Sequence, residues 1–163
     1  MQFQLGLHRK CTQMFRGRYE HTVDTKGRLS IPAKYREILL GKGDPRLIIT
    51  NFVVSSKRCL DVYPLDEWTA LEEAVRQRPK FDPNMVRFQT YYLGGAMECE
   101  VDTHGRILIP PTLRKYADLK RDVMLVSAGD KFRIWDKDAW EEVFTEAEGQ
   151  LMEDPGSFSD LGL

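Results

Sequence analysis

The sequence has few cysteines, and Cys11, Cys59 and Cys99 are widely spaced with no C-x-x-C pair. An odd, scattered set argues against a disulfide framework or a zinc site and favours reduced thiols. No apolar run approaches the roughly 18 residues needed to cross a bilayer. The first residues, MQFQLGLHRK, lack the pattern of a signal peptide. We therefore expect a cytoplasmic protein without a membrane partner.

Common enzyme motifs are also missing. The chain contains no G-x-G-x-x-G after a strand, no G-x-x-x-x-G-K-[ST], no G-x-S-x-G and no H-E-x-x-H. The histidines His8, His21 and His104 are scattered, so a metal cluster has little support. Asp102 and His104 suggest an acid–base pair, but Lys26 stands at the matching place in the related segment described below. We predict that the chain is not an enzyme and takes no cofactor, metal or small-molecule substrate.

The net charge of −1 conceals an uneven distribution. From Asp136 to the end there are nine acidic residues and one lysine, a charge of −8, so the preceding residues carry +7. Within 14–36 the basic residues outnumber Glu20 and Asp24; they are Arg16, Arg18, Lys26, Arg28, Lys34 and Arg36. A basic body with an acidic end suits a polyanion partner. Two solvated faces of opposite sign explain the charge pattern equally well.

One segment occurs twice. VDTKGRLSIP at 23–32 returns as VDTHGRILIP at 101–110, with seven of ten positions identical. YEHTVDTKGRLSIPAKYREIL aligns with MECEVDTHGRILIPPTLRKYA at an offset of 78, and LDVYPLDEW aligns with FRIWDKDAW at an offset of 72. The first copy therefore has six extra residues around LLGKGDPR, as a surface loop tolerates. A repeat of this length predicts two similar structural units.

Each copy predicts a strand, a tight turn and a second strand. Met97, Cys99 and Val101 alternate with acidic residues, which indicates a half-buried strand. A Thr-x-Gly turn follows in both copies, where Gly27 and Gly105 can take positive φ. The second strand in each copy begins with one apolar face.

Helices follow in both copies. Pro32 and Pro110 suit the first turn of a short helix, because no N–H is needed there. Each copy continues with a strand pair and a closing helix, which we expect Asp66 or Asp136 to cap. Two β-α-β units too small to hold a core alone should fold together as one pseudo-twofold body.

A further helix should connect the copies. Asp82-Pro83 favours its start and Gly94-Gly95 its end. An apolar stripe of Met85, Phe88, Tyr92 and Leu93 indicates core or subunit contact. The predicted organisation is an N-terminal extension (1–13), a first repeat with its closing helix (14–80), a connecting helix (81–95), a second repeat (96–144) and an acidic, flexible tail (145–163).

The repeated Asp-Thr-x-Gly-Arg places an arginine in each loop. Turn geometry or an ion pair explains the aspartates, but explains the arginines less well. Lys26 and His104 put a cationic or potentially cationic group beside each arginine, although histidine is mostly neutral near neutral pH. Such loops meet phosphates, and arginine also binds guanine O6 and N7. We predict DNA contacts from Arg28, Arg106, Lys26, His104, Arg16 and Arg18, and a loop scaffold of Asp24, Asp102, Gly27 and Gly105.

The segments MFRGRYEHTVDTKGRLSIPAKYRE and GGAMECEVDTHGRILIPPTLRKYADL resemble the MraZ family of bacterial transcriptional regulators, over about Met14 to Phe144. The resemblance implies two SpoVT-AbrB-type domains in an α+β fold, a pseudo-twofold swapped-hairpin β-barrel with flanking helices. It also implies a homo-oligomeric ring, associated with the nucleoid. Such rings bind direct repeats of double-stranded DNA in the promoter of their own division and cell-wall operon. The family's D-x-x-x-R motif corresponds to Asp24 with Arg28 and Asp102 with Arg106.

A protein-binding role is the second interpretation. AbrB-like folds also occur as antitoxins that hold a toxin through a flexible tail. The acidic residues 145–163 suit such a tail. Removing the residues after Phe144 separates the two interpretations, because DNA binding should survive and partner capture should vanish.

Overall fold

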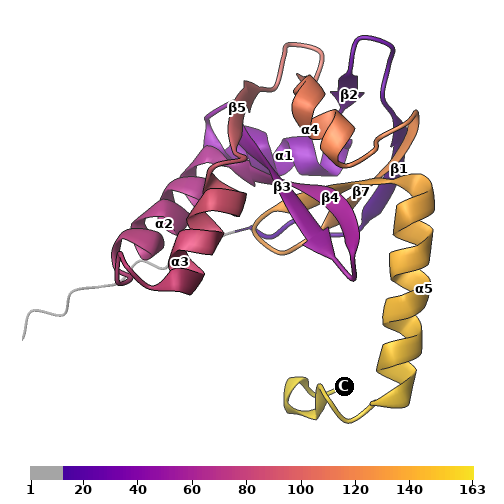
Figure 1. The fold of residues 1–163 in the computed structure, drawn as a ribbon. Coiled ribbons are helices and arrows are strands. Elements are labelled where there is room, and N and C mark those ends of the chain that lie inside the picture. Colours follow the sequence, from indigo (N-terminus) through magenta and orange to yellow (C-terminus); the bar gives the residue numbers. More distant parts are fainter. Residues whose placement is uncertain (1–12) are drawn as a thin grey trace, which may run out of the picture.

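The computed structural model describes residues 13–163, so most of the predicted N-terminal extension, together with His8 and Cys11, lies outside the described residues. The first copy contains β1 (Arg18–Thr22), β2 (Arg28–Ser30), α1 (Ala33–Lys42), β3 (Arg46–Val54), β4 (Lys57–Pro64) and α2 (Leu65–Arg76). The second contains β5 (Met97–Glu100), β6 (Arg106–Leu108), α4 (Pro111–Tyr116), β7 (Asp122–Ser127), β8 (Phe132–Asp136) and α5 (Lys137–Glu153). Between them lie α3 (Pro83–Phe88) and the π-helix η1 (Gln89–Leu93), and the 3₁₀-helix η2 (Ser159–Leu161) follows α5. The fold is mixed α+β (Figure 1).

Prolines mark the starts of three helices. Pro32, Pro64 and Pro110 occupy the N-cap positions of α1, α2 and α4, with φ between −52° and −57°. A proline ring fixes φ in this range and supplies no N–H, so it suits the junction of a strand and a helix. Pro32 and Pro110 therefore stand one position before the first turn in which they were predicted.

The predicted cap of α2 by Asp66 is wrong, and the predicted cap of α5 by Asp136 is correct in position only. Asp66 lies inside the first turn of α2, after the N-cap. Asp136 is the N-cap of α5, but its side chain makes no capping bond. The carboxylate is buried and accepts a hydrogen bond from the Lys120 backbone N–H at 3.2 Å, because it faces the segment before β7.

The strands of the two copies are interleaved. A six-stranded antiparallel sheet has the order β1-β7-β8-β4-β3-β5, and β2 pairs with β6 in a separate two-stranded ribbon. The strands β1, β3 and β4 of the first copy correspond to β5, β7 and β8 of the second. Exchanging corresponding strands gives the same order read from the opposite edge, so the sheet has pseudo-twofold symmetry. Each copy's first strand pairs with a strand of the other copy. This pairing leaves β1 and β5 as edges, so the swapped-hairpin barrel is not confirmed as a closed barrel.

Two residue pairs lie on the pseudo-twofold axis. Leu29 faces its counterpart Ile107 in the β2/β6 ribbon, and Asp61 faces its counterpart Arg133 between β4 and β8. Arg133 Nε donates to Asp61 Oδ1 at 2.7 Å, and the Tyr92 hydroxyl donates to Oδ2 at 2.5 Å. Two identical chains would place like charges at this position. The fused chain instead places opposite charges there, which compensates the fully buried Asp61.

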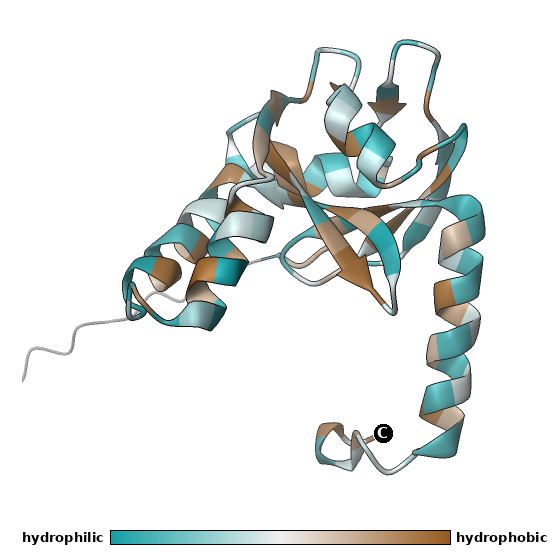
Figure 2. Cartoon of the chain, viewed as in Figure 1, coloured by the Kyte–Doolittle hydropathy of each residue, from teal (hydrophilic) through white to brown (hydrophobic). Residues whose placement is uncertain are grey.

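Both copies contribute to one main core. It combines side chains from the strands and from α1 and α4, including Leu29, Tyr35, Ile107 and Leu125. Figure 2 shows hydrophobic residues in the strands of the sheet, while the helices carry a mixture of hydrophilic and hydrophobic residues. Neither copy therefore encloses a core by itself.

The connecting helix packs beside α2, where Tyr92 is buried and Phe88 and Leu93 contact the same apolar cluster. Asp82 caps α3 by accepting a hydrogen bond from the Asn84 N–H at 2.9 Å. In β5, Met97 is 43% exposed, so the predicted burial of this residue is wrong. Met97 is the first residue of β5, whereas Cys99 further along the same strand packs against the main core.

The last helix extends beyond residue 144, where the second repeat was predicted to end and the flexible tail to begin. α5 continues to Glu153, so residues 145–153 of the predicted flexible tail are helical. Glutamate, alanine, glutamine, leucine and methionine dominate this stretch, and all are strong helix formers. Every residue from Phe144 onward is exposed, and Figure 1 shows α5 extending away from the sheet.

Candidate nucleic-acid interface

The first loop is organised by one carboxylate. Asp24 Oδ1 accepts hydrogen bonds from the backbone N–H groups of Lys26 and Arg28, both at 2.9 Å. Asp24 Oδ2 accepts a third from Arg28 Nε at 2.6 Å. Main-chain bonds from Gly27 N to Asp24 O and from Asp24 N to Arg28 O close the turn. A single side chain therefore fixes the loop backbone and holds the guanidinium of Arg28.

The second loop repeats this arrangement. Asp102 Oδ1 accepts from the backbone N–H groups of His104 and Arg106 at 2.8 and 2.9 Å, and Oδ2 accepts from Arg106 Nε at 3.2 Å. The backbone N–H of each arginine is the largest cause that lowers the pKa of its aspartate. Both carboxylates therefore stay ionised well below neutral pH.

The two arginines keep donors available. Both guanidinium groups donate through Nε, and within residues 13–163 their Nη groups have no hydrogen-bond partner. The Arg28 and Arg106 side chains are 36% and 31% exposed. Held at one nitrogen, each guanidinium has a restricted orientation and can still donate to a ligand.

Each loop also carries an arginine from the other copy, which sequence reasoning missed. A Cβ at Gly27 would overlap Arg114 Nη1, and a Cβ at Gly105 would overlap Arg36 Nη1. The helix arginines therefore pack directly against the loop glycines. Both glycines also have positive φ, +84° and +74°, as predicted. Arg36 and Arg114 align at the offset of 78, and this match is the signal that could have identified them.

The strands that follow the loops form a shared outward face. Leu29 and Ile107 are buried beneath the β2/β6 ribbon. Successive side chains alternate between faces, so Arg28, Ser30, Arg106 and Leu108 share the other face.

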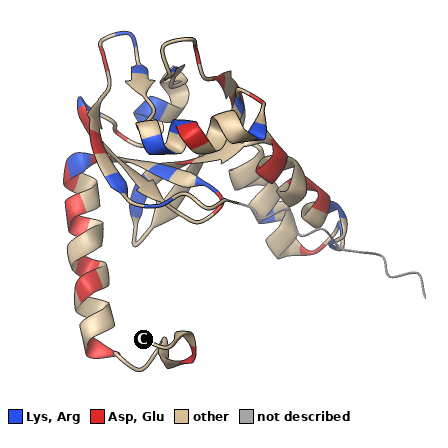
Figure 3. Cartoon of the chain, turned by 180° about the vertical axis from the view of Figure 1, so that it is seen from behind, with Lys and Arg blue, Asp and Glu red and all other residues tan. Residues whose placement is uncertain are grey.

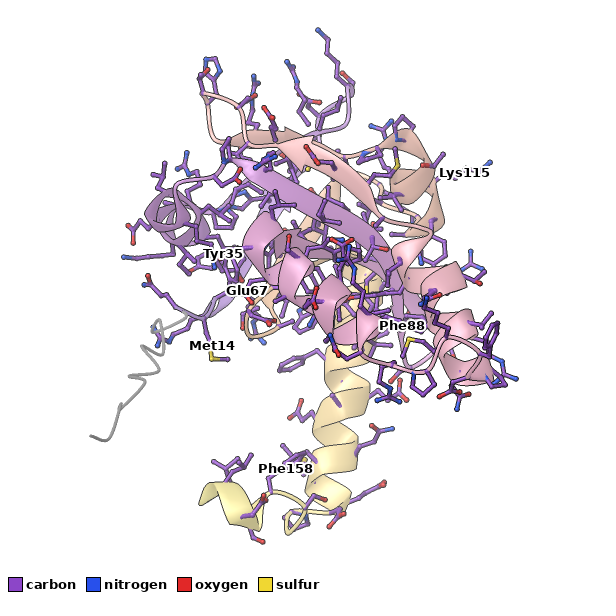
Figure 4. All side chains as sticks on the ribbon, turned by 90° about the vertical axis from the view of Figure 1, so that its left-hand side faces the viewer. Met14, Tyr35, Glu67, Phe88, Lys115 and Phe158 are labelled. Carbon is purple, nitrogen blue, oxygen red and sulfur yellow. The ribbon has the colours of Figure 1, made fainter. Side chains whose placement is uncertain are left out.

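The loops are also tied across the ribbon, because Ile31 N donates to Gly105 O and Ile109 N donates to Gly27 O, both at 2.9 Å. Figure 4 shows the loop side chains projecting from the end of the molecule opposite Phe158. The twin loops and the ribbon thus form one surface, the loop face.

Positive charge gathers on the loop face. It contains Lys26, Arg28, Arg36, Arg106 and Arg114, with the carboxylates of Asp24 and Asp102 bonded into the loops. Figure 3 shows Lys and Arg at this end, while acidic residues are frequent along α5. A phosphate backbone is the kind of ligand that such a face attracts.

The structure does not bring Arg16 and Arg18 together with the loops. Arg18 begins β1, at the end of the strand away from the first loop; five residues of strand span roughly 16 Å. Its guanidinium carbon lies 4.6 Å from the centroid of the Phe144 ring in α5. Arg16 is exposed just before this strand.

The possible metal ligands of the described residues are not clustered, and both described cysteines have a raised pKa. Within residues 13–163 there is no group of three His, Cys, Asp or Glu side chains that could hold a metal. Cys59 and Cys99 form no disulfide with each other, and burial raises the pKa of each thiol to about 12. A thiol with that pKa is a poor nucleophile at neutral pH. No helix in the described part of the chain is both long and apolar enough to span a membrane.

The fold and the loop face define a class of protein: a single chain in which two similar α+β units exchange strands and present paired arginine loops. A family model described as "MraZ protein, putative antitoxin-like" matches residues 14–90 and 92–156. The chain therefore belongs to the MraZ family.

Curated relatives agree with this assignment. The transcriptional regulator MraZ of Thioalkalivibrio sulfidiphilus is 46% identical over 127 residues, which cover 78% of this chain and 83% of the relative. The proteins of the same name from Pseudomonas fluorescens and Desulfitobacterium hafniense are 42% and 41% identical, and the matches cover 90% and 92% of this chain. They cover 95% and 100% of those relatives. All three carry the name of a transcriptional regulator, and none carries that of an enzyme.

Proposed function

We propose that this chain is a DNA-binding transcriptional regulator that contacts double-stranded DNA through the loop face. One observation carries the proposal: Arg28 and Arg106, each held by an aspartate, lie on the same outward face, and among residues 13–163 their Nη groups have no hydrogen-bond partner. The names of the relatives support the regulatory role.

The proposed contacts follow from the chemistry of each side chain. An aspartate-held guanidinium can donate two parallel hydrogen bonds to guanine O6 and N7 in the major groove. Lys26, Arg36 and Arg114 would neutralise phosphates that flank the contacted base pairs, and His104 would add a weaker contact. Asp24, Asp102 and the loop glycines position these groups without contacting DNA themselves.

We also propose that several protomers assemble to bind DNA together. One protomer has few cationic contacts, so its binding to DNA should be weak. A homo-oligomeric ring would display the loop face at fixed spacing, and several faces on successive direct repeats raise affinity through effective concentration. Family membership supports a cytoplasmic, nucleoid-associated ring of this kind at the promoter of its own division and cell-wall operon. The exchange of β1 and β5 supports a swapped-hairpin relationship between the two units.

A titration with the protein's own upstream DNA tests the proposal. The double variant Arg28→Ala/Arg106→Ala should lose about a hundredfold or more in affinity, because two base-reading contacts are removed. Arg76→Ala is the matched control: this α2 arginine is 76% exposed, lies off the loop face and should bind DNA like wild type. If the folded double variant binds as tightly as wild type, the proposal is wrong.

A protein-binding role is a second candidate, favoured by the exposed apolar residues in the C-terminal segment. Leu151, Met152, Phe158, Leu161 and Leu163 are between 45% and 86% exposed. The family description also contains the word antitoxin-like. Such a segment could bind the apolar groove of a partner.

Truncation after Phe144 separates the two candidates, because it removes only exposed residues. We expect the truncated chain to stay folded and to bind DNA at least as tightly as wild type, since five acidic residues are lost. Binding isotherms on the same DNA measure this. A loss of DNA binding after truncation would contradict the assignment of the contacts to the loop face.

A further inference from the structure

The loop face is symmetric in its backbone but differs at one central position. Ser30 and Leu108 are counterparts in the two copies, at the ends of β2 and β6. Leu108 is 56% exposed although it is apolar. The other outward residues of this ribbon are polar or charged, so Leu108 is the one apolar side chain on its outward face.

Leu108 stands directly beside an arginine. In the antiparallel ribbon Leu108 pairs with Arg28, and Ser30 pairs with Arg106. Directly opposite residues project on the same face, with Cβ atoms about 5 Å apart. A ligand that reaches the guanidinium of Arg28 therefore meets the Leu108 side chain at the neighbouring position.

A two-stranded ribbon fits the major groove of B-DNA, and the groove contains one apolar group, the C5-methyl of thymine. A leucine beside a guanine-reading arginine matches a thymine next to that guanine. A serine hydroxyl at the equivalent place has no such preference, since it can donate or accept with several bases.

We propose that Leu108 is a specificity-determining residue that contacts the methyl group of a thymine adjacent to the base bound by Arg28. The inference rests on the proposed function and deepens it. Because Ser30 stands in the other half, the two halves of the face read different base pairs. A face with pseudo-twofold symmetry thereby recognises a non-palindromic sequence and binds DNA in one direction.

Replacing thymine by uracil tests this contact, because uracil lacks only the C5-methyl. Uracil is placed at one thymine position at a time, in every repeat of the upstream DNA, and affinity is measured for each position. Wild type should lose about threefold to fourfold per repeat at one position, as expected for one buried methyl group. Leu108→Ser should bind uracil and thymine equally at that position, while Leu108→Met should keep the difference.

Ser30→Ala is the matched control, because it lies on the same face in the other copy and should leave the uracil effect unchanged. Leu108 is exposed, so circular dichroism and thermal melting of Leu108→Ser should match wild type. The inference is overturned if uracil at every position leaves the affinity of wild type unchanged. It is also overturned if Leu108→Ser loses as much affinity as wild type when uracil replaces thymine. In that case Arg28→Ala would still weaken binding if the proposed function holds; if it does not, both proposals fail.

Discussion

At the scale of residues, each loop aspartate combines two tasks. Asp24 and Asp102 satisfy two backbone N–H groups of their turns and also fix an arginine through Nε. Their pKa values are lowered, so the stability that they contribute is present above the ordinary value and is lost only as the pH falls through the lowered value. The geometry of the loops is therefore constant across the neutral range.

Gly27→Ala and Gly105→Ala should damage both stability and DNA binding. An alanine at positive φ costs about 1–2 kcal/mol, and its Cβ would displace the guanidinium of Arg114 or Arg36. Thermal melting and DNA titration measure the two effects.

Gly43→Ala is the matched control for these glycines. Its φ is +71°, but no atom lies within 4 Å of the added Cβ. It should lose similar stability and keep DNA affinity. If all three variants bind DNA equally well, the helix arginines do not act on the loop face.

Sequence reasoning reached part of this site. The repeated decapeptide contains the aspartates, the glycines and Arg28 and Arg106, so the loops could be predicted from two copies of one short motif. Arg36 and Arg114 were missed because a helix residue next to a loop of the other copy leaves no local pattern. Only the strand exchange brings each of them to its glycine. Arg16 and Arg18 are cationic like the loop arginines, but they lie at or just before the start of β1, and the first loop follows the opposite end of this strand.

At the scale of elements, the pairing of β4 with β8 joins the two copies through the Asp61–Arg133 contact. Asp61→Ala should destabilise the chain by about 3 kcal/mol, because it leaves Arg133 and the Tyr92 hydroxyl without their acceptor. We take the lower end of the usual range, since the Arg133 side chain is 26% exposed. Chemical denaturation followed by tryptophan fluorescence measures the loss.

Asp44→Ala serves as the control for Asp61→Ala. It breaks an ion pair with Arg46 whose members are 34% and 47% exposed, and such surface pairs contribute little to stability. If the two variants lose the same free energy of unfolding, the Asp61–Arg133 contact stabilises the chain no more than a surface ion pair does.

The elements themselves were more predictable than their ends. Alternating apolar residues and the proline and glycine positions indicate the eight strands and their helices in the correct order. Helix ends were harder to predict. The Asp136 carboxylate accepts a hydrogen bond from Lys120 N instead of capping α5, and α5 continues past Phe144 because strong helix formers follow. The sequence offered no way to choose between a closed barrel and the open strand order, because pairing partners are long-range.

At the scale of the whole molecule, the two charge signs are separated. The cationic loop face lies at one end, and the acidic end of the chain projects from the other (Figure 3). Long-range attraction would therefore orient the protein on DNA with the loops first and α5 away from the phosphates. The main core is built from both copies, so the two loops keep a fixed relation to each other.

The central claim is that both copies contact the same DNA through matching arginines. The most direct test is the affinity of wild type, Arg28→Ala and Arg106→Ala for the protein's own upstream DNA across a series of salt concentrations. We predict that each single variant loses about tenfold or more and keeps a steep dependence of affinity on salt, because Lys26, Arg36 and Arg114 still neutralise phosphates. Folded single variants with wild-type affinity at every salt concentration would contradict the account.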